Sequence, residues 1–340
     1  PSFFKEVVGQ SRDQLVQEFP SVFGTEHCYL ARSGGGSNGA FGAGLLVGWS
    51  AAGTRPEFTI VTGISTGALI APFAFLGEAY DAKLKEMYTK YSTKDLVVKH
   101  NFINALLGSS EVGTAPMKKV MAKYYNQQVM EAIAAEHKKG RRLFVATTNL
   151  DARRPVIWNL GLIASRGRPD DLELMRKIIL ASASIPAIFP PELFEVEADG
   201  KRFDEMHVDG GATAQVFLYP AALDWKFVLE KFEVPGRPKA YVVRNARLKA
   251  DWKTIDPKIL PIAGETIKSL IRTQGIGDIY RIYLDCQRDG IDFNLAHIAA
   301  DFDLKPKQFF DPVYMGKLFD QAYQLARNGY PWEKIPPGFE

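Results

Sequence analysis

The segment Gly63-Ile64-Ser65-Thr66-Gly67 places a serine between two glycines where a strand gives way to a helix. Residues 58–62 are all β-branched or aromatic, which favours a buried strand. Residues 68–76 favour a helix, interrupted only by Pro72. Side chains larger than those of glycine would clash in so tight a turn, and the turn holds the serine hydroxyl out beside a helix N-terminus. The segment therefore predicts that Ser65 is a nucleophile.

A second glycine-rich segment lies upstream of the serine turn. Residues 29–32 predict a short strand, residues 33–39 contain three consecutive glycines, and residues 40–52 predict an apolar helix. Glycines before a helix leave backbone N–H groups that can point at one anion. An acyl-transfer serine needs such donors for its oxyanion, and removal of one donor typically costs roughly 3–4 kcal/mol of barrier. Taken alone, either segment is also compatible with an ordinary glycine-rich turn.

The upstream loop also matches the Gly-x-Gly-x-x-Gly pattern of dinucleotide-binding folds, at Gly34, Gly36 and Gly39. That fold needs an acidic residue at the end of the next strand, about 20 residues further on, to bind ribose. The nearest acid is Glu57, which precedes the second strand, and the end of that strand carries the serine turn instead. Dinucleotide binding is therefore disfavoured.

Composition narrows the function classes further. The chain has 340 residues, 46% hydrophobic and 24% charged, which is ordinary for a globular protein, and a net charge of +3 is too small to indicate a nucleic-acid partner. The sequence contains no apolar run of 18 residues, so we expect a soluble or peripheral protein. The chain begins at Pro1 rather than Met, which is compatible with processing and export. Neither the subcellular compartment nor the oligomeric state is indicated.

The cysteines and histidines give no sign of a metal or redox centre. Cys28 begins a predicted core strand and Cys286 lies on a predicted helix, so we expect buried free thiols. The five histidines are scattered, and no Cys/His cluster has zinc-ligand spacing. We therefore expect neither a metal nor a cofactor.

Strands and helices alternate between Cys28 and about Leu248, which predicts a mostly parallel sheet covered by helices. The expected strands are residues 28–33, 58–62, 143–149, 155–160, 205–209 and 240–246. Two antiparallel hairpins are expected, one around residues 151–153 and one around Asp199-Gly200. Helical spacing of apolar residues recurs over residues 276–284 and 315–326. We expect a lead-in helix within residues 1–27, with Leu15, Val16 and Phe19 on one face, a catalytic domain over 28–222, and an extension over 223–340 packed on the same sheet.

A nucleophilic serine needs a base. His100, His137, His207 and His297 follow Ser65, but none lies in a Gly-flanked loop after a clear strand. The marked position is Asp209-Gly210-Gly211, an acid at the end of a predicted strand. Alone it would be an ordinary surface turn, but beside the two glycine-rich segments it becomes a candidate for the base. A relay through His207 stays conceivable, because residues two apart on a strand share a face; His297 also stays open.

Taken together, these segments resemble the patatin-like phospholipase family. The family's glycine-rich oxyanion loop, serine elbow and Asp-Gly turn are matched, in the same order, by Gly34-Gly35-Gly36-Ser37-Asn38-Gly39, by residues 63–67 and by Asp209-Gly210-Gly211. A fourth block, small residues leading into Phe-Pro, is matched by residues 181–190. The resemblance extends over about residues 28–222.

The resemblance implies a three-layer α/β/α sandwich that hydrolyses acyl esters of lipids through a Ser-Asp dyad. Ser65 would be the nucleophile and Asp209 the base, and the N–H groups of Gly35 and Gly36, together with Gly34, would form the oxyanion hole. Gly39, Gly63, Gly67, Gly210 and Gly211 would support these motifs. Asn38 stands where the family usually has Arg or Lys, so this side chain can donate a hydrogen bond but supplies no charge.

Two functions follow from this resemblance. The first is a lipid acyl hydrolase acting on phospholipids or lysophospholipids, with contact to a membrane surface. The second, given weight by Asn38, is a catalytically inactive protein that keeps the fold to bind lipid or a partner. Head group, chain length and positional preference are not indicated. An acyl pocket lined by Leu45, Leu46, Val47 and Trp49 is conceivable, although packing of these residues on the sheet is the simpler interpretation.

Overall fold

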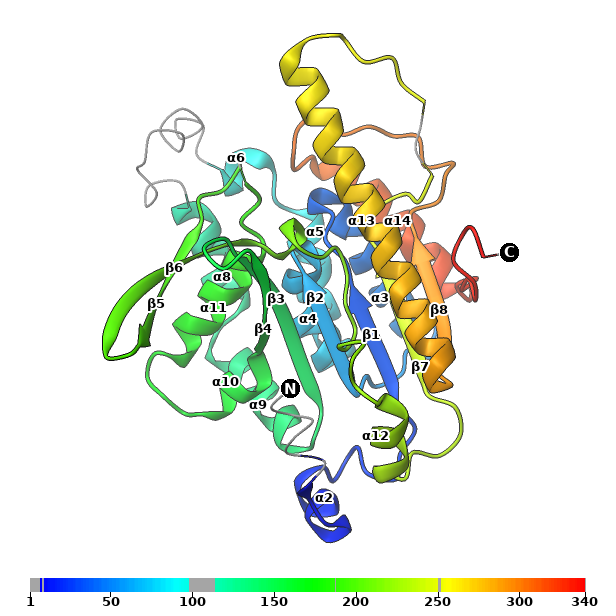
Figure 1. The fold of residues 1–340 in the computed structure, drawn as a ribbon. Coiled ribbons are helices and arrows are strands. Elements are labelled where there is room, and N and C mark those ends of the chain that lie inside the picture. The colour runs from blue at the N-terminus through cyan, green and yellow to red at the C-terminus, as the bar shows by residue number, and fades with distance from the viewer. Residues whose placement is uncertain (1–6, 8, 98–113, 187, 250–251, 340) are drawn as a thin grey trace.

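The core of the fold is one sheet, seen in a computed structural model that describes residues 7, 9–97, 114–186, 188–249 and 252–339 (Figure 1). Within these residues the sheet has eight strands in the order β5-β6-β3-β2-β1-β7-β8, with β4 also paired to β3. The parallel strands are β1 (Cys28–Arg32), β2 (Ile60–Ile64), β3 (Arg142–Asn149), β7 (Lys239–Arg244) and β8 (Asp292–His297). The antiparallel strands are β4 (Arg154–Asn159), β5 (Glu192–Ala198) and β6 (Lys201–Asp209).

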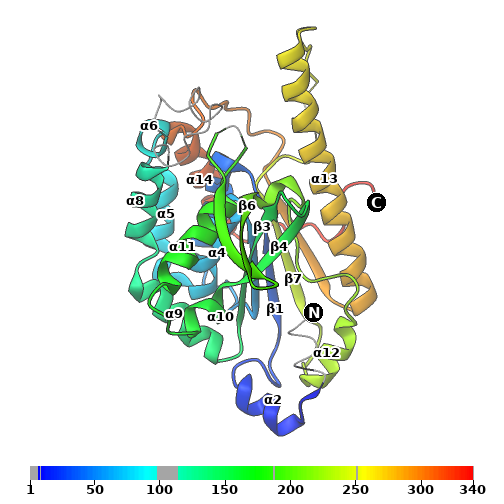
Figure 2. The same ribbon diagram turned by 60° about the vertical axis from the view of Figure 1, so that its left-hand side comes forward.

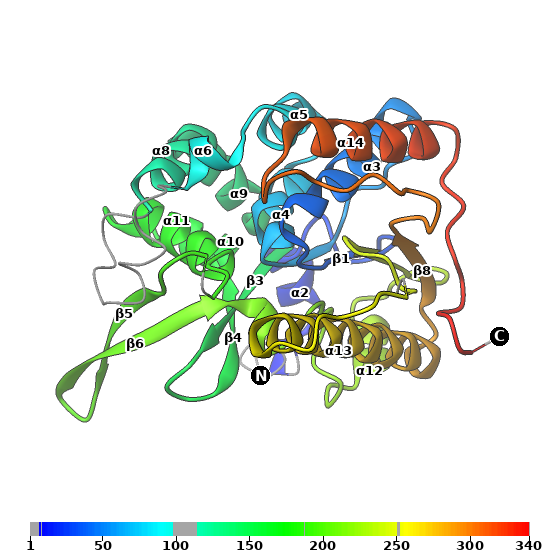
Figure 3. The same cartoon turned by 90° about the horizontal axis from the view of Figure 1, so that it is seen from above.

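Helices cover both faces of this sheet, which gives the three layers expected from the sequence (Figure 3). One face is covered by α3 (Gly39–Ala51), α4 (Thr66–Leu76), α5 (Asp81–Thr89), α8 (Ala115–Tyr124), α9 (Gln127–Lys138), α10 (Leu160–Ser165), α11 (Asp171–Ser182) and α14 (Pro312–Arg327). The other face is covered by α12 (Trp225–Lys231) and α13 (Ile259–Asp289), and α2 (Arg12–Glu18) packs near its lower edge. A short helix, α6 (Thr93–Leu96), and three 3-10 turns (Gly36–Asn38, Glu78–Tyr80 and Gly210–Ala212) complete the described elements.

The two hydrophobic cores follow from side-chain alternation along the central strands. In β1, Leu30 belongs to the core beneath α3 and α4, whereas Tyr29 and Ala31 belong to the core beneath α12 and α13. Successive side chains of a strand point to opposite faces, so a parallel strand that is buried on both faces is apolar at almost every position. Strands β1 and β2 are buried along their whole length, because helices cover them on both faces.

Close helix packing fixes α3 against α14. A Cβ atom added at Gly44 would lie 2.1 Å from the carbonyl oxygen of Phe319, and one at Gly48 would lie 2.2 Å from that of Tyr323. Only glycine allows the two backbones to approach so closely. The helix that follows the glycine-rich loop is thereby held by the C-terminal part of the chain.

Several sequence predictions are confirmed at the level of elements. The strands of the alternating region, both hairpins and the helices flanking the serine turn are present within a few residues of their expected bounds. Cys28 and Cys286 are buried free thiols, as expected. Residues after 222 contribute β7, β8, α13 and α14 to the same sheet and cores.

Other predictions are wrong. Val16 is exposed, so the apolar face of α2 is formed by Leu15 together with Phe19 just beyond its end. Strand β8 was not expected, because its sequence Asp-Phe-Asn-Leu-Ala-His mixes polar and apolar residues and contains no β-branched residue. Helix α13 begins at Ile259, well before the helical spacing expected over residues 276–284, and includes Pro261. A proline in the first helical turn is tolerated, since its missing N–H would have no partner there.

Within the described residues, no helix is both long enough and apolar enough to cross a bilayer.

Candidate active site

The serine turn has the strained geometry that its sequence predicts. Ser65 lies between the end of β2 and the start of α4, with φ 56° and ψ −125°. A residue other than glycine seldom adopts a positive φ, and such strain is characteristic of functional sites. Both flanking glycines are required by contact: a Cβ at Gly63 would lie 2.4 Å from the carbonyl oxygen of Gly67, and one at Gly67 would lie 2.5 Å from that of Arg32.

Ser65 and Asp209 are hydrogen-bonded to each other. The Ser65 hydroxyl donates to Oδ2 of Asp209 at 2.6 Å, and both residues are buried. Asp209 ends β6, which pairs with β3, the neighbour of β2, so the sheet brings the two residues to the same edge. The second carboxylate oxygen, Oδ1, accepts a hydrogen bond from the N–H of Gly211 at 2.7 Å. This arrangement leaves Oδ2 directed at the serine.

Burial changes the basicity of this carboxylate. Removal from water raises the pKa of Asp209 to about 6, while the hydrogen bonds from Ser65 and Gly211 act in the opposite direction. A carboxylate with a pKa closer to neutrality is a better general base than one in water, yet it is still mainly ionised at neutral pH. A carboxylate in this position and with this pKa can accept a proton from the hydroxyl that it contacts.

The glycine-rich loop lies against the serine. A Cβ at Gly34 would lie 3.1 Å from the Cβ of Ser65, and Gly35 and Gly36 have φ of 153° and 57°. The N–H of Gly34 donates to the carbonyl oxygen of Gln215 at 3.2 Å and is already engaged. Among the described residues, no hydrogen-bond acceptor faces the N–H groups of Gly35 and Gly36. These two N–H groups are the available donors of the predicted set.

Two residues that the sequence analysis missed hold this loop in place. The backbone N–H of Asn245 donates to Oγ of Ser33 at 2.8 Å, and its Nδ2 donates to the carbonyl oxygen of Ser33 at 2.9 Å. Gln215 receives the hydrogen bond from Gly34 and donates through Nε2 to the carbonyl oxygen of Gly211 at 2.6 Å. Gln215 therefore ties the glycine-rich loop to the Asp209 turn.

The block of small residues at the end of α11 holds the backbones of Ser65 and Asp209. Ser182 accepts a hydrogen bond from the N–H of Ser65 at 3.1 Å and donates to the carbonyl oxygen of Ala146 at 2.7 Å. The carbonyl oxygen of Ser184 accepts the N–H of Asp209 at 3.0 Å. One segment thus fixes the backbone of both residues.

Asn38 contacts a different part of the chain. Its Oδ1 accepts a hydrogen bond from the hydroxyl of Tyr314 in α14 at 2.7 Å. The amide therefore anchors the loop to α14, where a lysine or arginine would have placed a charge.

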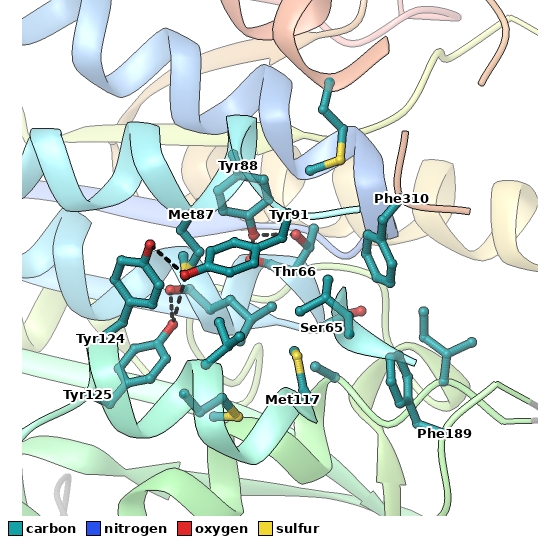
Figure 4. A pocket seen from close by; sticks show the side chains of 18 residues that line it. Ser65, Thr66, Met87, Tyr88, Tyr91, Met117, Tyr124, Tyr125, Phe189 and Phe310 are labelled. Atoms are coloured by element: carbon teal, nitrogen blue, oxygen red, sulfur yellow. Dashed lines mark hydrogen bonds between the residues drawn. The ribbon is translucent and has the colours of Figure 1, made fainter. Parts of the chain in front are cut away.

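An apolar cavity opens beside Ser65 (Figure 4). Phe189 and Phe310 lie on either side of the serine, and Tyr124 and Tyr125 close the far end. The tyrosine hydroxyls at this end have hydrogen-bond partners within the protein. The hydroxyl of Tyr124 donates to that of Tyr91 at 3.2 Å, and the hydroxyl of Tyr125 donates to the carbonyl oxygen of Leu69 at 2.6 Å. The other lining residues are Gly36, Thr66, Met87, Tyr88, Leu96, Met117, Val120, Met121, Ala183, Ile185 and Met315.

The acyl pocket considered for Leu45, Leu46, Val47 and Trp49 of α3 is not formed. Leu45, Leu46 and Trp49 are buried in the core beneath α3, and Val47 packs against that core. None of the four lines the cavity beside Ser65. They serve packing, as the simpler interpretation held.

The side chains of His207 and His297, which follow Ser65 in the chain, contact residues other than Ser65. His207 hydrogen-bonds through Nδ1 with Oγ1 of Thr147 at 2.8 Å and packs against Trp158 and Phe194, and burial lowers its pKa. His297 ends β8, three strand spacings or about 14 Å from β2, and bonds to Glu333. His100 lies outside the described residues. A search of residues 7, 9–97, 114–186, 188–249 and 252–339 finds no group of three or more His, Cys, Asp or Glu that could hold a metal ion.

The fold and the site together define a class: a three-layer α/β/α protein that presents a serine and an aspartate to each other at the carboxyl edge of its sheet. Residues 30–222, more than half of the chain, match the family described as patatin-like phospholipase. The chain therefore belongs to the patatin-like phospholipase family, whose members are lipid acyl hydrolases.

No curated protein matches the sequence. Among solved structures, the crystal structure of VipD from Legionella pneumophila is similar, with 12% sequence identity and a TM-score of 0.39 over 89% of this chain and 67% of that chain.

Proposed function

We propose that this protein hydrolyses acyl ester bonds of phospholipids or lysophospholipids through an acyl-enzyme on Ser65, with Asp209 as the base. The observation that carries the proposal is the 2.6 Å hydrogen bond from the Ser65 hydroxyl to the buried Asp209 carboxylate. A serine hydroxyl is a weak nucleophile unless an adjacent base takes its proton during attack. The proposed catalytic domain is residues 28–222, with residues 1–27 and 223–340 as its lead-in helix and extension.

In the first half of the proposed reaction, Oγ of Ser65 attacks the ester carbonyl carbon while its proton passes to Oδ2 of Asp209. The carbonyl oxygen becomes an oxyanion, which accepts hydrogen bonds from the N–H groups of Gly35 and Gly36. Collapse of this intermediate breaks the bond to the alcohol, which leaves with the proton from Asp209. The acyl group is now esterified to Ser65.

In the second half, a water molecule attacks the acyl-enzyme and gives its proton to Asp209. The new oxyanion uses the same N–H groups, and its collapse returns the proton to Ser65 and releases the fatty acid. The apolar cavity beside Ser65 would hold the acyl chain, because its lining side chains are aromatic and aliphatic. The bonded tyrosines at its far end would limit chain length.

The test is covalent labelling by a fluorophosphonate, together with turnover of a soluble short-chain ester. The wild-type chain should gain one phosphonyl group by mass, mapped to Ser65, and should hydrolyse the ester. Ser65→Ala should lose both properties and keep its circular dichroism spectrum. A folded wild-type chain that neither labels nor turns over any ester would instead establish the inactive lipid-binding alternative, and labelling of Ser65→Ala at another serine would refute the assignment.

A further inference from the structure

Helix α13 extends well past the candidate site. Its residue Gln274 donates through Nε2 to the carbonyl oxygen of Thr213 at 2.6 Å and accepts a hydrogen bond from Gln215 at 3.3 Å, so Gln274 lies level with the Asp209 turn. Residues 259–273 of the same helix precede Gln274, and at about 1.5 Å per residue they span about 22 Å. We call these residues the α13 arm. Figures 1 and 2 show the arm rising beyond the sheet on the side where β1 and β2 end.

The arm carries large apolar side chains in water. Ile259, Leu260, Ile267 and Leu270 are 87%, 83%, 57% and 66% exposed. At about 100° per residue these four and Ile271 fall within an arc of about 120°, and Ile262, 50% exposed, lies about 60° outside it, so the arm carries an apolar stripe with one further apolar side chain beside it. An exposed, contiguous apolar stripe of this kind marks an interaction surface.

The stripe is on the same side of the helix as the candidate site. Gln274 and Asp278 fall within the same arc by the same count, and both contact the segment after the Asp209 turn: Oδ2 of Asp278 accepts the N–H of Gln215 at 2.6 Å. Nearer the site, Gln274 is partly buried and Asp278 is buried, whereas in the arm the same arc is exposed.

Charge indicates which partner fits. Residues 247–272 contain six basic residues (Arg247, Lys249, Lys253, Lys258, Lys268 and Arg272) and three acidic ones (Asp251, Asp256 and Glu265), a net charge of +3. The whole chain also carries +3, so the remaining residues sum to zero. Two copies facing each other here would oppose like charges, whereas an anionic lipid surface complements them. Trp252, 91% exposed, adds an aromatic side chain of the kind that settles at membrane interfaces.

We propose that the α13 arm and the preceding residues 247–249 and 252–258 form the docking surface for an anionic lipid bilayer. The apolar stripe enters the headgroup region, and the excess positive charge of the segment, which remains after its internal ion pairs are counted, attracts the lipid phosphates. Docking in this way turns the carboxyl edge of the sheet, and with it Ser65, toward the lipid. The consequence for catalysis rests on the proposed function, but the binding itself does not require a reactive serine.

The test uses the full chain carrying Ser65→Ala, so that vesicles stay intact. Flotation is measured with vesicles of phosphatidylcholine alone and of phosphatidylcholine mixed with phosphatidylglycerol. Leu260→Ser/Ile267→Ser/Leu270→Ser removes three residues of the stripe. The matched control is Leu162→Ser/Ile157→Ser/Leu284→Ser, the same residue types at 54%, 47% and 53% exposure away from the arm.

The parent and the control should bind the anionic vesicles, added salt should weaken that binding, and the stripe variant should bind at least about tenfold less. Three outcomes would overturn the proposal. The stripe variant could bind as well as the control, or the parent could fail to bind at all. The parent could also be a dimer that the stripe substitutions convert to a monomer. The last outcome would make a second copy the occupant. Circular dichroism checks that each variant is folded.

A second measurement separates this proposal from the catalytic one. With Ser65 restored, the stripe variant should turn over a soluble short-chain ester at the wild-type rate, because the ester needs no docking. A wild-type chain that binds anionic vesicles but turns over no ester would refute the proposed function and leave the docking surface standing.

Discussion

The N–H of Gly34 donates to the carbonyl oxygen of Gln215 at 3.2 Å, and through this contact the two halves of the site share one framework. Gln215 also holds Gly211, whose own N–H fixes the carboxylate of Asp209. The glycine-rich loop and the Asp209 turn are therefore positioned against Ser65 by the same residue. A 2.6 Å serine–carboxylate hydrogen bond needs such a framework, because an error of even 1 Å would misalign proton transfer.

Removal of the Asn38–Tyr314 hydrogen bond from either end should have the same effect. Asn38→Ala and Tyr314→Phe each delete the 2.7 Å contact, which is worth about 1 kcal/mol, so each should lower kcat by about fivefold through displacement of the oxyanion loop. The double variant should be no slower than either single one. A much larger loss for Asn38→Ala, with Tyr314→Phe unaffected, would mean that the amide itself contacts the oxyanion.

The stability of the protein should depend on the charge of Asp209. Burial raises the pKa of Asp209 to about 6 from an ordinary value of 3.8, so the folded chain holds this proton more tightly than the unfolded chain does. The stabilising contribution of this group is complete below about pH 4 and is lost as the pH rises through about 6. Asp209→Asn has no charge to bury, and its Tm should exceed that of the wild type at about pH 8 but not at about pH 4. A Tm difference independent of pH would contradict the raised pKa.

The same pKa predicts a pH profile. The base must be ionised to accept the serine proton, so kcat/KM on a soluble ester should fall as the pH drops through about 6, the pKa of Asp209. A profile that is flat down to about pH 4 would mean that a different group is the base.

The glycines of the serine turn should not tolerate a methyl group. A Cβ at Gly67 would lie 2.5 Å from the carbonyl oxygen of Arg32 and 2.7 Å from that of Ser33, so Gly67→Ala should destabilise the fold by about 1–3 kcal/mol. The matched control is Gly264→Ala in α13, where nothing lies within 4 Å and alanine should stabilise the helix by up to about 1 kcal/mol. Urea denaturation measures both, and equal effects would contradict the close approach at Gly67.

The elements around Ser65 and the Asp209 turn were predictable because their constraints are local. The glycines at 63 and 67 are dictated by contacts within the turn and with the end of the neighbouring strand, and such contacts impose a recognisable five-residue pattern. The proximity of Ser65 and Asp209 follows from two strands ending at one edge of the sheet.

The supporting residues were not predictable, because they act across long separations in sequence. Asn245 contacts Ser33 over 212 positions, and no motif surrounds Asn245 or Gln215 to signal a role. Arg141 and Arg142, at the junction of α9 and β3, are both buried. Arg141 donates to the carbonyl oxygens of Phe58, just before β2, and Phe75, near the end of α4. These backbone acceptors need a partner only once the fold is assembled, so the sequence around Arg141 does not indicate its role.

Two variants distinguish Asp209 from His207 as the base that accepts the proton of Ser65. The asparagine of Asp209→Asn has nearly the same shape as aspartate but cannot accept the proton of Ser65. The ring of His207 contacts Thr147, Trp158 and Phe194 instead of Ser65. For one soluble ester, measured per folded protein, kcat/KM should fall by about 1,000-fold or more in Asp209→Asn and by less than about tenfold in His207→Ala. The opposite ranking of the two variants would contradict the Ser65–Asp209 dyad.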